Sequence, residues 1–263
     1  MMHPVFKDLQ ALRERPIPGQ ADVKAAIQGY RSHPLNREDV RFSEALVTIE
    51  ELGIAGRSFY RGPINPPYYT QVPDAASGVL LREGVGQKLL AVNQRLAETG
   101  LEVFAFDAWR PTSVQAYFFE DWMPTEVRQR NPHFSNEDVL REVQRYWSAP
   151  TMDENSPAPH ATGGAIDLTL RWKDTGEHLW MGSIFDDVSK LARLDLFEVE
   201  FNDPNDFAYS HEEARANRRL LYWIMRDAGF AHNPNEWWHF SHGDMLWARI
   251  VGEPAAFYGL ASA

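Results

Sequence analysis

Two short clusters in this sequence combine histidine with carboxylates at close spacing. The first runs from His160 to Asp167 (HATGGAID), and the second runs from Glu236 to His239 (EWWH). The chain has no cysteine, so disulfides, thiolate nucleophiles and cysteine-ligated metals are excluded, and any metal must sit on His, Asp or Glu. Two histidines and one carboxylate suit catalytic zinc, which keeps a fourth position for water. Glu236 is then a spare carboxylate that can accept the proton of that water.

Each cluster on its own has a plainer interpretation, because a histidine or aspartate beside glycines is more often a turn residue or a hydrogen-bonding residue than a ligand. Together, the clusters supply a full ligand set and a base, which favours a metal site. The sequence lacks the motifs of other common enzyme classes. The serine-nucleophile motifs GxSxG and SxxK, the phosphate-binding P-loop and GxGxxG are absent. The sequence His211-Glu212 does not extend to HExxH, since Arg215 occupies the place of the second histidine.

The elements around the clusters indicate how the clusters could converge. Alternating residues predict a strand over 164–172 that presents Asp167 on one face, and Gly163 with Gly164 permits a tight turn that brings His160 back over it. Glu236 falls in the turn that follows Asn233-Pro-Asn, and His239 begins the next strand. A bend between them could direct both side chains to one point.

The remaining chain predicts a mixture of helices and strands. A strand over 101–109 runs into Arg110-Pro111, residues 178–181 are expected to return as the second strand of a hairpin, and the Pro-, Gly- and Tyr-rich segment 58–78 is expected to be an ordered loop. Apolar spacing and capping residues predict helices over 21–28, over 87–98 before Gly100, over 113–122, from Ser135 (capped with Asp138) to Trp147, and from a Ser210/Glu213 capping box to Ala228 before Gly229.

The composition of the chain is typical of a globular protein. The 263 residues are 44% hydrophobic with a mean hydropathy of −0.44, so the chain can bury a core. The net charge of −11 disfavours nucleic acid as a partner, and no apolar run approaches a membrane span or a signal segment, so a cytoplasmic location is expected. We expect one α+β domain over residues 41–263, preceded by an N-terminal arm over residues 1–40. The sequence leaves the oligomeric state open.

The two clusters resemble the motifs of a known family, the zinc D-alanyl-D-alanine dipeptidases of the vancomycin-resistance type. HATGGAID matches the family pattern S-x-H-x-x-G-x-A-x-D from the histidine onward, EWWH matches E-x-W-H, and FDAWRP (106–111) resembles the upstream Arg-Pro motif. The segments 167–186 and 217–230 also resemble the family, and the whole resemblance covers roughly residues 75–250 in the correct order.

The resemblance implies a fold, a cofactor and roles for six residues. The fold is a small antiparallel sheet flanked by helices, shared with hedgehog-type domains. One zinc ion is implied on His160, Asp167 and His239, with Glu236 as general base and acid. Arg110 would stabilise the oxyanion, and Asp186 would pair with the ammonium group of a small dipeptide substrate.

Several alternatives stay open. Arg110 could instead form a structural salt bridge with Asp107 or bind an anion at the start of the helix, and Asp186 could be a solvated loop acid. The family's serine two residues before the first histidine is Ala158 here, and the stretch 187–211 is long, so the exact dipeptide is not fixed. A D,D-carboxypeptidase or endopeptidase acting on peptidoglycan stems, and a non-catalytic zinc-stabilised binding module, are the competing functions.

Overall fold

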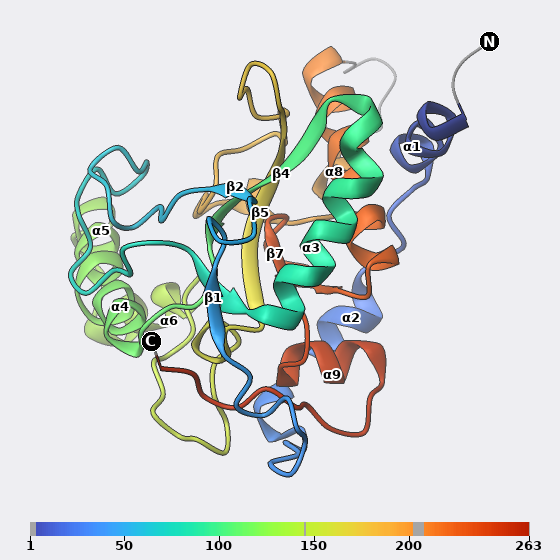
Figure 1. The fold of residues 1–263 in the computed structure, drawn as a ribbon. Coiled ribbons are helices and arrows are strands. Elements are labelled where there is room, and N and C mark those ends of the chain that lie inside the picture. The colour runs from blue at the N-terminus through green and yellow to red at the C-terminus, as the bar shows by residue number, and fades with distance from the viewer. Residues whose placement is uncertain (1–3, 145, 202–207, 263) are drawn as a thin grey trace.

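A five-stranded sheet in the order β2-β4-β5-β7-β6 forms the centre of the computed structural model, which describes residues 4–144, 146–201 and 208–262 (Figure 1). The strands are β2 (Ala55–Gly56), β4 (Leu101–Asp107), β5 (Ala165–Trp172), β6 (Ala231–His232) and β7 (His239–Ser241). The pairs β4–β5, β5–β7 and β6–β7 are antiparallel, whereas the short β2 is parallel to β4. The expected α+β class is confirmed, and the strands that carry the predicted site pair antiparallel.

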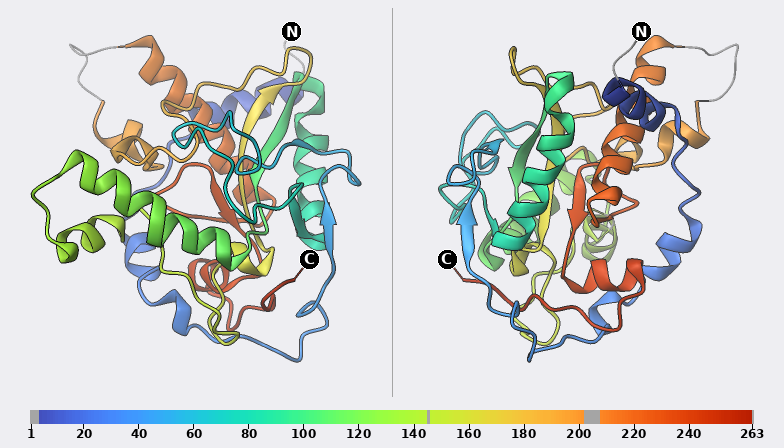
Figure 2. Two further views of the ribbon diagram at one scale, coloured as in Figure 1. Left: turned by 90° about the vertical axis from the view of Figure 1, so that its left-hand side faces the viewer. Right: turned by 45° about the vertical axis from the view of Figure 1, so that its right-hand side comes forward.

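Helices flank this sheet on two sides. The helix α3 (Glu83–Leu96) packs against β4, and α8 (Tyr209–Asp227) lies beside β6 with α1 (Pro4–Glu14) on its outer side (Figures 1 and 2). The predicted end of α3 is confirmed, since a 3-10 turn follows it and Gly100 adopts a φ of +76°. A two-stranded sheet of β1 (Leu46–Thr48) and β3 (Leu80–Arg82) leads into α3.

A helical lobe stands apart from the sheet (Figure 2). It consists of α4 (Thr112–Ala116), a π-helical turn over Tyr117–Trp122, α5 (Met123–Arg130) and α6 (Asn136–Val143). The predicted stop at Trp122 is wrong, because Pro124 sits in the first turn of α5, where its missing N–H is not needed. The capping box of Ser135 and Asp138 is confirmed, although α6 ends before Trp147.

Two further sequence predictions are corrected by the structure. The helix α8 begins at Tyr209 after the cap residue Ala208, so Ser210 and Glu213 lie inside the helix and form no capping box. Residues 178–181 do not form a full strand, since the pairing is limited to a bridge between His178 and Arg171. The remaining helices are the short α2 (Ala21–Ala26), α7 (Leu196–Val199) and α9 (Met245–Val251).

The N-terminal residues pack closely on the rest of the chain. Leu9, Leu12 and Ile17 are buried in the main core, and Arg13 donates a hydrogen bond to Asn217 of α8. The division into an arm of residues 1–40 and a domain of residues 41–263 stays a prediction. No helix in the part of the chain that the structure describes is long and apolar enough to cross a membrane.

Candidate active site

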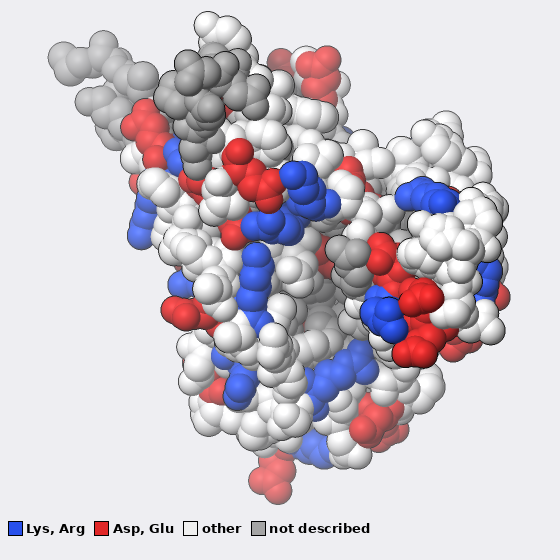
Figure 3. Space-filling view, turned by 180° about the vertical axis from the view of Figure 1, so that it is seen from behind, with Lys and Arg blue, Asp and Glu red and all other residues white. Residues whose placement is uncertain are grey.

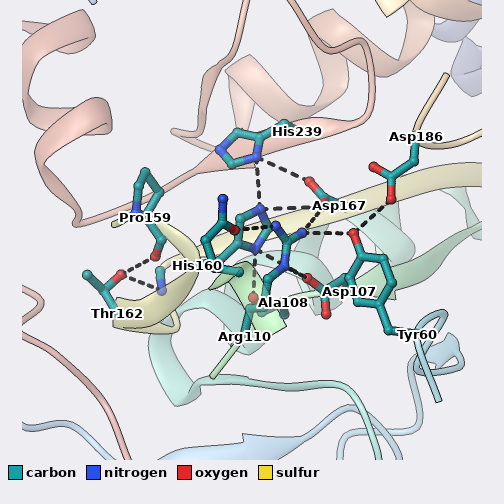
Figure 4. A network of polar contacts seen from close by, with 12 residues as sticks. Tyr60, Asp107, Ala108, Arg110, Pro159, His160, Thr162, Asp167, Asp186 and His239 are labelled. Atoms are coloured by element: carbon teal, nitrogen blue, oxygen red, sulfur yellow. Dashed lines mark hydrogen bonds and ion pairs between the residues drawn. The ribbon is translucent and has the colours of Figure 1, made fainter. Parts of the chain in front are cut away.

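The sheet places the two sequence clusters side by side. In the strand register, Asp167 of β5 is paired with His239 of β7 on one side and with Asp107 of β4 on the other. His160 comes from the turn that precedes β5 and points to the same place (Figure 4). The predicted convergence of His160, Asp167 and His239 is therefore present in the structure.

The turn that carries His160 depends on its glycines. Residues His160–Thr162 form one 3-10 turn, and Gly163 ends it with a φ of +73°. A Cβ at Gly163 would lie 2.5 Å from Leu46 Cδ2, and one at Gly164 would lie 2.5 Å from the backbone oxygen of His242. The glycines therefore allow a close approach of the backbone that no larger residue permits.

The three side chains form a tight group of donor atoms. Asp167 Oδ2 lies 3.4 Å from His160 Nε2, and Asp167 Oδ1 lies 3.2 Å from His239 Nδ1. The two imidazole nitrogens are 3.1 Å apart, and one donor atom from each residue falls within 4.8 Å of the others. All three residues are buried.

The hydrogen bonds around this group fit a metal ion. His160 Nδ1 lies 2.7 Å from the carbonyl oxygen of Ala108, so this nitrogen carries the proton and donates, which leaves Nε2 with a lone pair. His239 Nε2 lies 3.2 Å from Ser241 Oγ, and a hydrogen bond donated there leaves Nδ1 with a lone pair as well. Asp167 Oδ1 is buried and has no hydrogen-bond partner among the described residues. Two facing lone pairs beside such a carboxylate oxygen are unfavourable unless a cation lies between them.

The ionisable groups of this cluster stabilise one another's charged forms. Burial alone would raise the pKa of Asp167, but the neighbouring imidazoles of His160 and His239 outweigh it and hold the pKa well below its usual range. Burial would lower the pKa of His239, yet Asp167 and Glu236 raise it above its ordinary value. Asp167 is thus an anion at neutral pH, as a metal ligand must be.

Glu236 stands beside the ligands without joining them. Its Oε2 lies 3.6 Å from His239 Nδ1, and its side chain is 29% exposed at the pocket. The predicted position in a turn is confirmed, since Glu236 N–H donates to Asn233 and His239 N–H donates back to Glu236. Desolvation in the pocket raises the pKa of Glu236, which brings the carboxylate closer to the proton affinity that a general base needs.

Arg110 forms the salt bridge considered for it and also faces the metal-ligand group. Its Nε donates to Asp107 at 2.8 Å, as the salt-bridge alternative predicts. One terminal nitrogen of the same guanidinium lies 3.2 Å from Asp167 Oδ2 and 3.0 Å from the hydroxyl of Tyr60, and Arg110 lines the pocket. The bond to Asp107 therefore orients a cation that faces the metal-ligand group.

Asp186 is not a solvated loop acid, so that alternative is wrong. Only 8% of the residue is exposed, and its Oδ2 accepts hydrogen bonds of 2.8 Å from the hydroxyls of both Tyr60 and Tyr68. Burial foremost, and then the charge of Asp167, raise the pKa of Asp186 to about 8. Sequence reasoning missed both tyrosines; the one available hint was their place in the segment 58–78, which the sequence predicts to be ordered.

One pocket of about 520 Å³ is lined by all six predicted site residues, Arg110, His160, Asp167, Asp186, Glu236 and His239. It opens between the helical lobe and the body of the molecule, where the surface is visibly hollowed (Figure 3). The lobe side contributes Gln144 and Trp147, the other side contributes the segment 187–190, and Ala158 lies in the wall without a hydroxyl group. A pocket of this volume holds a small organic molecule comfortably.

A buried His/Asp/His group with a separate glutamate at an open pocket is the arrangement of a mononuclear metallohydrolase. Residues 69–254 match the family described as D-ala-D-ala dipeptidase, and the chain belongs to that family. A D-alanyl-D-alanine dipeptidase of Synechocystis sp. is 33% identical over 196 residues, which cover 70% of this chain and 79% of that protein. One from Enterococcus faecium is 28% identical over 157 residues, or 59% of this chain and 69% of the relative.

Among solved structures, VanYB in complex with D-alanine-D-alanine aligns over 78% of this chain and 94% of its own, with 12% identity and a TM-score of 0.40.

Proposed function

We propose that this chain is a zinc-dependent dipeptidase that hydrolyses D-Ala-D-Ala or a closely related short dipeptide. The observation that carries the proposal is the buried group of His160, Asp167 and His239, whose facing donor atoms lie beside the separate carboxylate of Glu236. Membership of the D-ala-D-ala dipeptidase family, and relatives named D-alanyl-D-alanine dipeptidase, support the substrate.

One zinc ion per chain would be held by His160, Asp167 and His239. When bound, zinc lowers the pKa of a water molecule and polarises a carbonyl group. The chain itself fixes the two imidazoles, because the carbonyl of Ala108 and the hydroxyl of Ser241 each hold the ring nitrogen that faces away from the site.

Glu236 would move the proton. Its carboxylate accepts a proton from the attacking water and then delivers it to the nitrogen of the leaving residue, so that D-alanine departs as a neutral amine. The raised pKa of Glu236, caused by its desolvation, suits a group that must both take and release a proton.

Arg110 would bind the oxygen of the scissile carbonyl as negative charge develops on it. Because Asp107 and Tyr60 already hold the guanidinium in place, little reorganisation is needed at the moment of reaction. A cation fixed in a buried site is effective here, since the surrounding dielectric is low.

Asp186 would bind the free ammonium group of the substrate, whose positive charge would lower the raised pKa of this carboxyl and hold it as a carboxylate. The residue is buried with Tyr60 and Tyr68, so the amino end of a bound peptide would meet buried side chains there. This burial favours a dipeptidase over a carboxypeptidase or an endopeptidase, which must admit a longer chain on that side. A binding module without turnover would need neither Glu236 nor Arg110 in these positions.

The purified protein tests the proposal directly. We expect it to contain one zinc per chain and to release D-alanine from D-Ala-D-Ala, to lose this activity with a chelator, and to regain it with zinc. N-acetyl-D-Ala-D-Ala and a stem pentapeptide are expected to be poor substrates. Equal cleavage of the acetylated dipeptide would contradict the ammonium site, and zinc without any turnover would indicate a binding module.

The proposal extends to location and domain organisation. We propose that the enzyme acts in the cytoplasm, which fractionation of the source cells would test. We also propose that the catalytic machinery belongs to a domain over residues 41–263, with residues 1–40 as an arm packed on it. The buried side chains of Leu9 and Leu12 bind this arm to the core.

A further inference from the structure

Three residues that line the pocket, Ile27, Tyr30 and Tyr68, lie outside the part of the chain that matches the family, and two of them belong to the N-terminal segment. Ile27 follows α2, and Tyr30 opens a 3-10 turn over Tyr30–Ser32, whereas the family match begins at residue 69. The N-terminal segment therefore forms part of the wall of the candidate active site, although the predicted mechanism assigns it no role.

Contacts on both sides hold this segment across one end of the pocket. On the body side, Arg249 of α9 donates to the carbonyl of Ala26 at 3.0 Å. On the lobe side, Arg31 donates to the carbonyl of Ala149 at 3.1 Å, next to the pocket residue Ser148. Ser156, two residues before Ala158 in the pocket wall, donates to the carbonyl of Arg31 at 2.9 Å.

A dipeptide ends in a carboxylate, and most cations at the pocket already have partners. Lys190 and Arg193 both pair with Glu200, at 2.6 and 2.9 Å, and Arg110 pairs with Asp107. Arg31 lies behind the pocket residue Tyr30, and within the described ranges 4–144, 146–201 and 208–262 no carboxylate forms an ion pair with it.

The hydroxyl of Tyr30 connects this cation to the pocket. Arg31 Nε lies 3.4 Å from Tyr30 Oη and donates to it, so the hydroxyl keeps its own proton to donate elsewhere. Burial raises the pKa of Tyr30 above its ordinary value, so the hydroxyl keeps its proton at neutral pH.

The expected direction of the substrate runs from Asp186 past Glu236. Its ammonium group is bound by Asp186, and Glu236 protonates the nitrogen of the leaving residue. The terminal carboxylate would then lie beyond Glu236 in the same pocket, whose wall includes Tyr30.

We propose that Tyr30 and Arg31 bind the terminal carboxylate of the dipeptide, so that a segment outside the family match fixes where the substrate ends. The Tyr30 hydroxyl donates to the carboxylate, and the Arg31 guanidinium behind it supplies the positive charge. This inference rests on the proposed function and adds to it. Asp186 would bind the ammonium end of the dipeptide, while Tyr30 and Arg31 would bind its carboxylate end.

Kinetics on D-Ala-D-Ala and its C-terminal amide test the proposal. Tyr30→Phe and Arg31→Gln are expected to raise KM for the free acid by about 10- to 100-fold, the range for a lost hydrogen bond to a charged group, and to leave kcat nearly unchanged. Neither variant should change KM for the amide, and Arg31→Lys should restore part of the loss. Lys190→Gln, which removes another cation of the pocket wall, is the matched control and should behave like the wild type.

An acid-to-amide ratio that stays at the wild-type value in Tyr30→Phe and in Arg31→Gln would overturn the proposal, as would a loss confined to Lys190→Gln. Tyr30→Phe removes one hydroxyl group, so it decides the question if Arg31→Gln fails to fold. Calorimetric binding of D-Ala-D-Ala and its amide to the zinc-loaded Glu236→Gln protein gives a readout without turnover. If the wild type proves inactive, the proposed function fails, while this binding comparison still accepts or rejects the carboxylate site.

Discussion

At the scale of single residues, the two imidazoles depend on the groups behind them as much as on each other. His239 Nε2 lies 3.2 Å from Ser241 Oγ on the side away from the metal group. Without that hydroxyl, the ring loses the contact that keeps Nδ1 unprotonated and turned toward Asp167. We expect Ser241→Ala to weaken zinc binding about 10- to 100-fold, measured by competition with a chromophoric chelator. An unchanged zinc affinity would show that packing alone orients the ring.

Glu236 allows a sharper separation of metal binding from catalysis. Its carboxylate lies 3.6 Å from His239 Nδ1 and is outside the ligand group, so Glu236→Gln should retain one zinc per chain. Turnover should fall about 10²- to 10⁴-fold, because the amide cannot accept the proton of the water. Zinc analysis and D-alanine release on the same preparation check both parts. Near-wild-type turnover would remove Glu236 from the mechanism.

Sequence spacing was sufficient to predict that His160, Asp167 and His239 converge with Glu236 beside them, because these residues lie in two short local motifs. It could not predict the partners of Asp186. Tyr60 and Tyr68 are more than 100 positions away along the chain, and only tertiary packing brings their hydroxyls to one carboxylate oxygen. The burial of Asp186 was missed for the same reason.

At the scale of elements, one buried side chain of α8 holds the loop that carries Asp186. The guanidinium of Arg218 donates to the carbonyls of Met181, Leu191 and Arg193, at both ends of that loop. It has no ion-pair partner in the described part of the chain, and burial lowers its pKa to about 9. Three carbonyl groups thus take the place of a counter-ion, and the loop is fixed at both ends by one residue.

This arrangement predicts a defined kinetic defect. Arg218→Lys keeps the charge but cannot reach three carbonyl groups with one ammonium, so the loop should loosen around Asp186. We expect KM for D-Ala-D-Ala to rise about 10-fold, a loss of uniform binding, with kcat and zinc content retained. Arg219→Lys is the matched control, because the neighbouring Arg219 pairs with Glu198 instead. Equal falls in kcat for both variants would indicate general destabilisation.

The ends of helices were predictable where a local residue such as glycine terminates them, and other boundaries were less predictable. Gly100 and Gly229 stop α3 and α8 as expected, because both adopt a positive φ. The start of α8 and the continuation of helix past Trp122 depend on packing that no local pattern records. The strands β6 and β7 are two and three residues long, too short for alternation to define their bounds, although the His239 position was correct.

At the scale of the whole molecule, the N-terminal segment is tied to the sheet through a buried histidine. His232 of β6 is 1% exposed, and its Nε2 lies 2.6 Å from Oε1 of Gln20. Burial foremost, with the charge of Arg226 acting in the same direction, lowers the pKa of His232 to about 3. The folded protein therefore keeps this ring neutral far below the pH at which an unfolded chain protonates it.

The difference makes stability depend on pH in a predictable direction. Between the ordinary histidine pKa of about 6.5 and the folded value of about 3, the unfolded chain binds a proton that the folded chain does not, so the free energy of unfolding falls as the pH falls through this window. His232 should contribute up to about 1.4 kcal/mol per pH unit there.

Urea unfolding from pH 7 to 4, with a chelator present so that zinc release does not enter, should give a shallower pH dependence for His232→Gln than for the wild type. His133→Gln, at an exposed position between α5 and α6, is the control and should keep the wild-type slope. If the free energy of unfolding changes equally with pH in all three proteins, His232 is not the group that makes the fold less stable in acid.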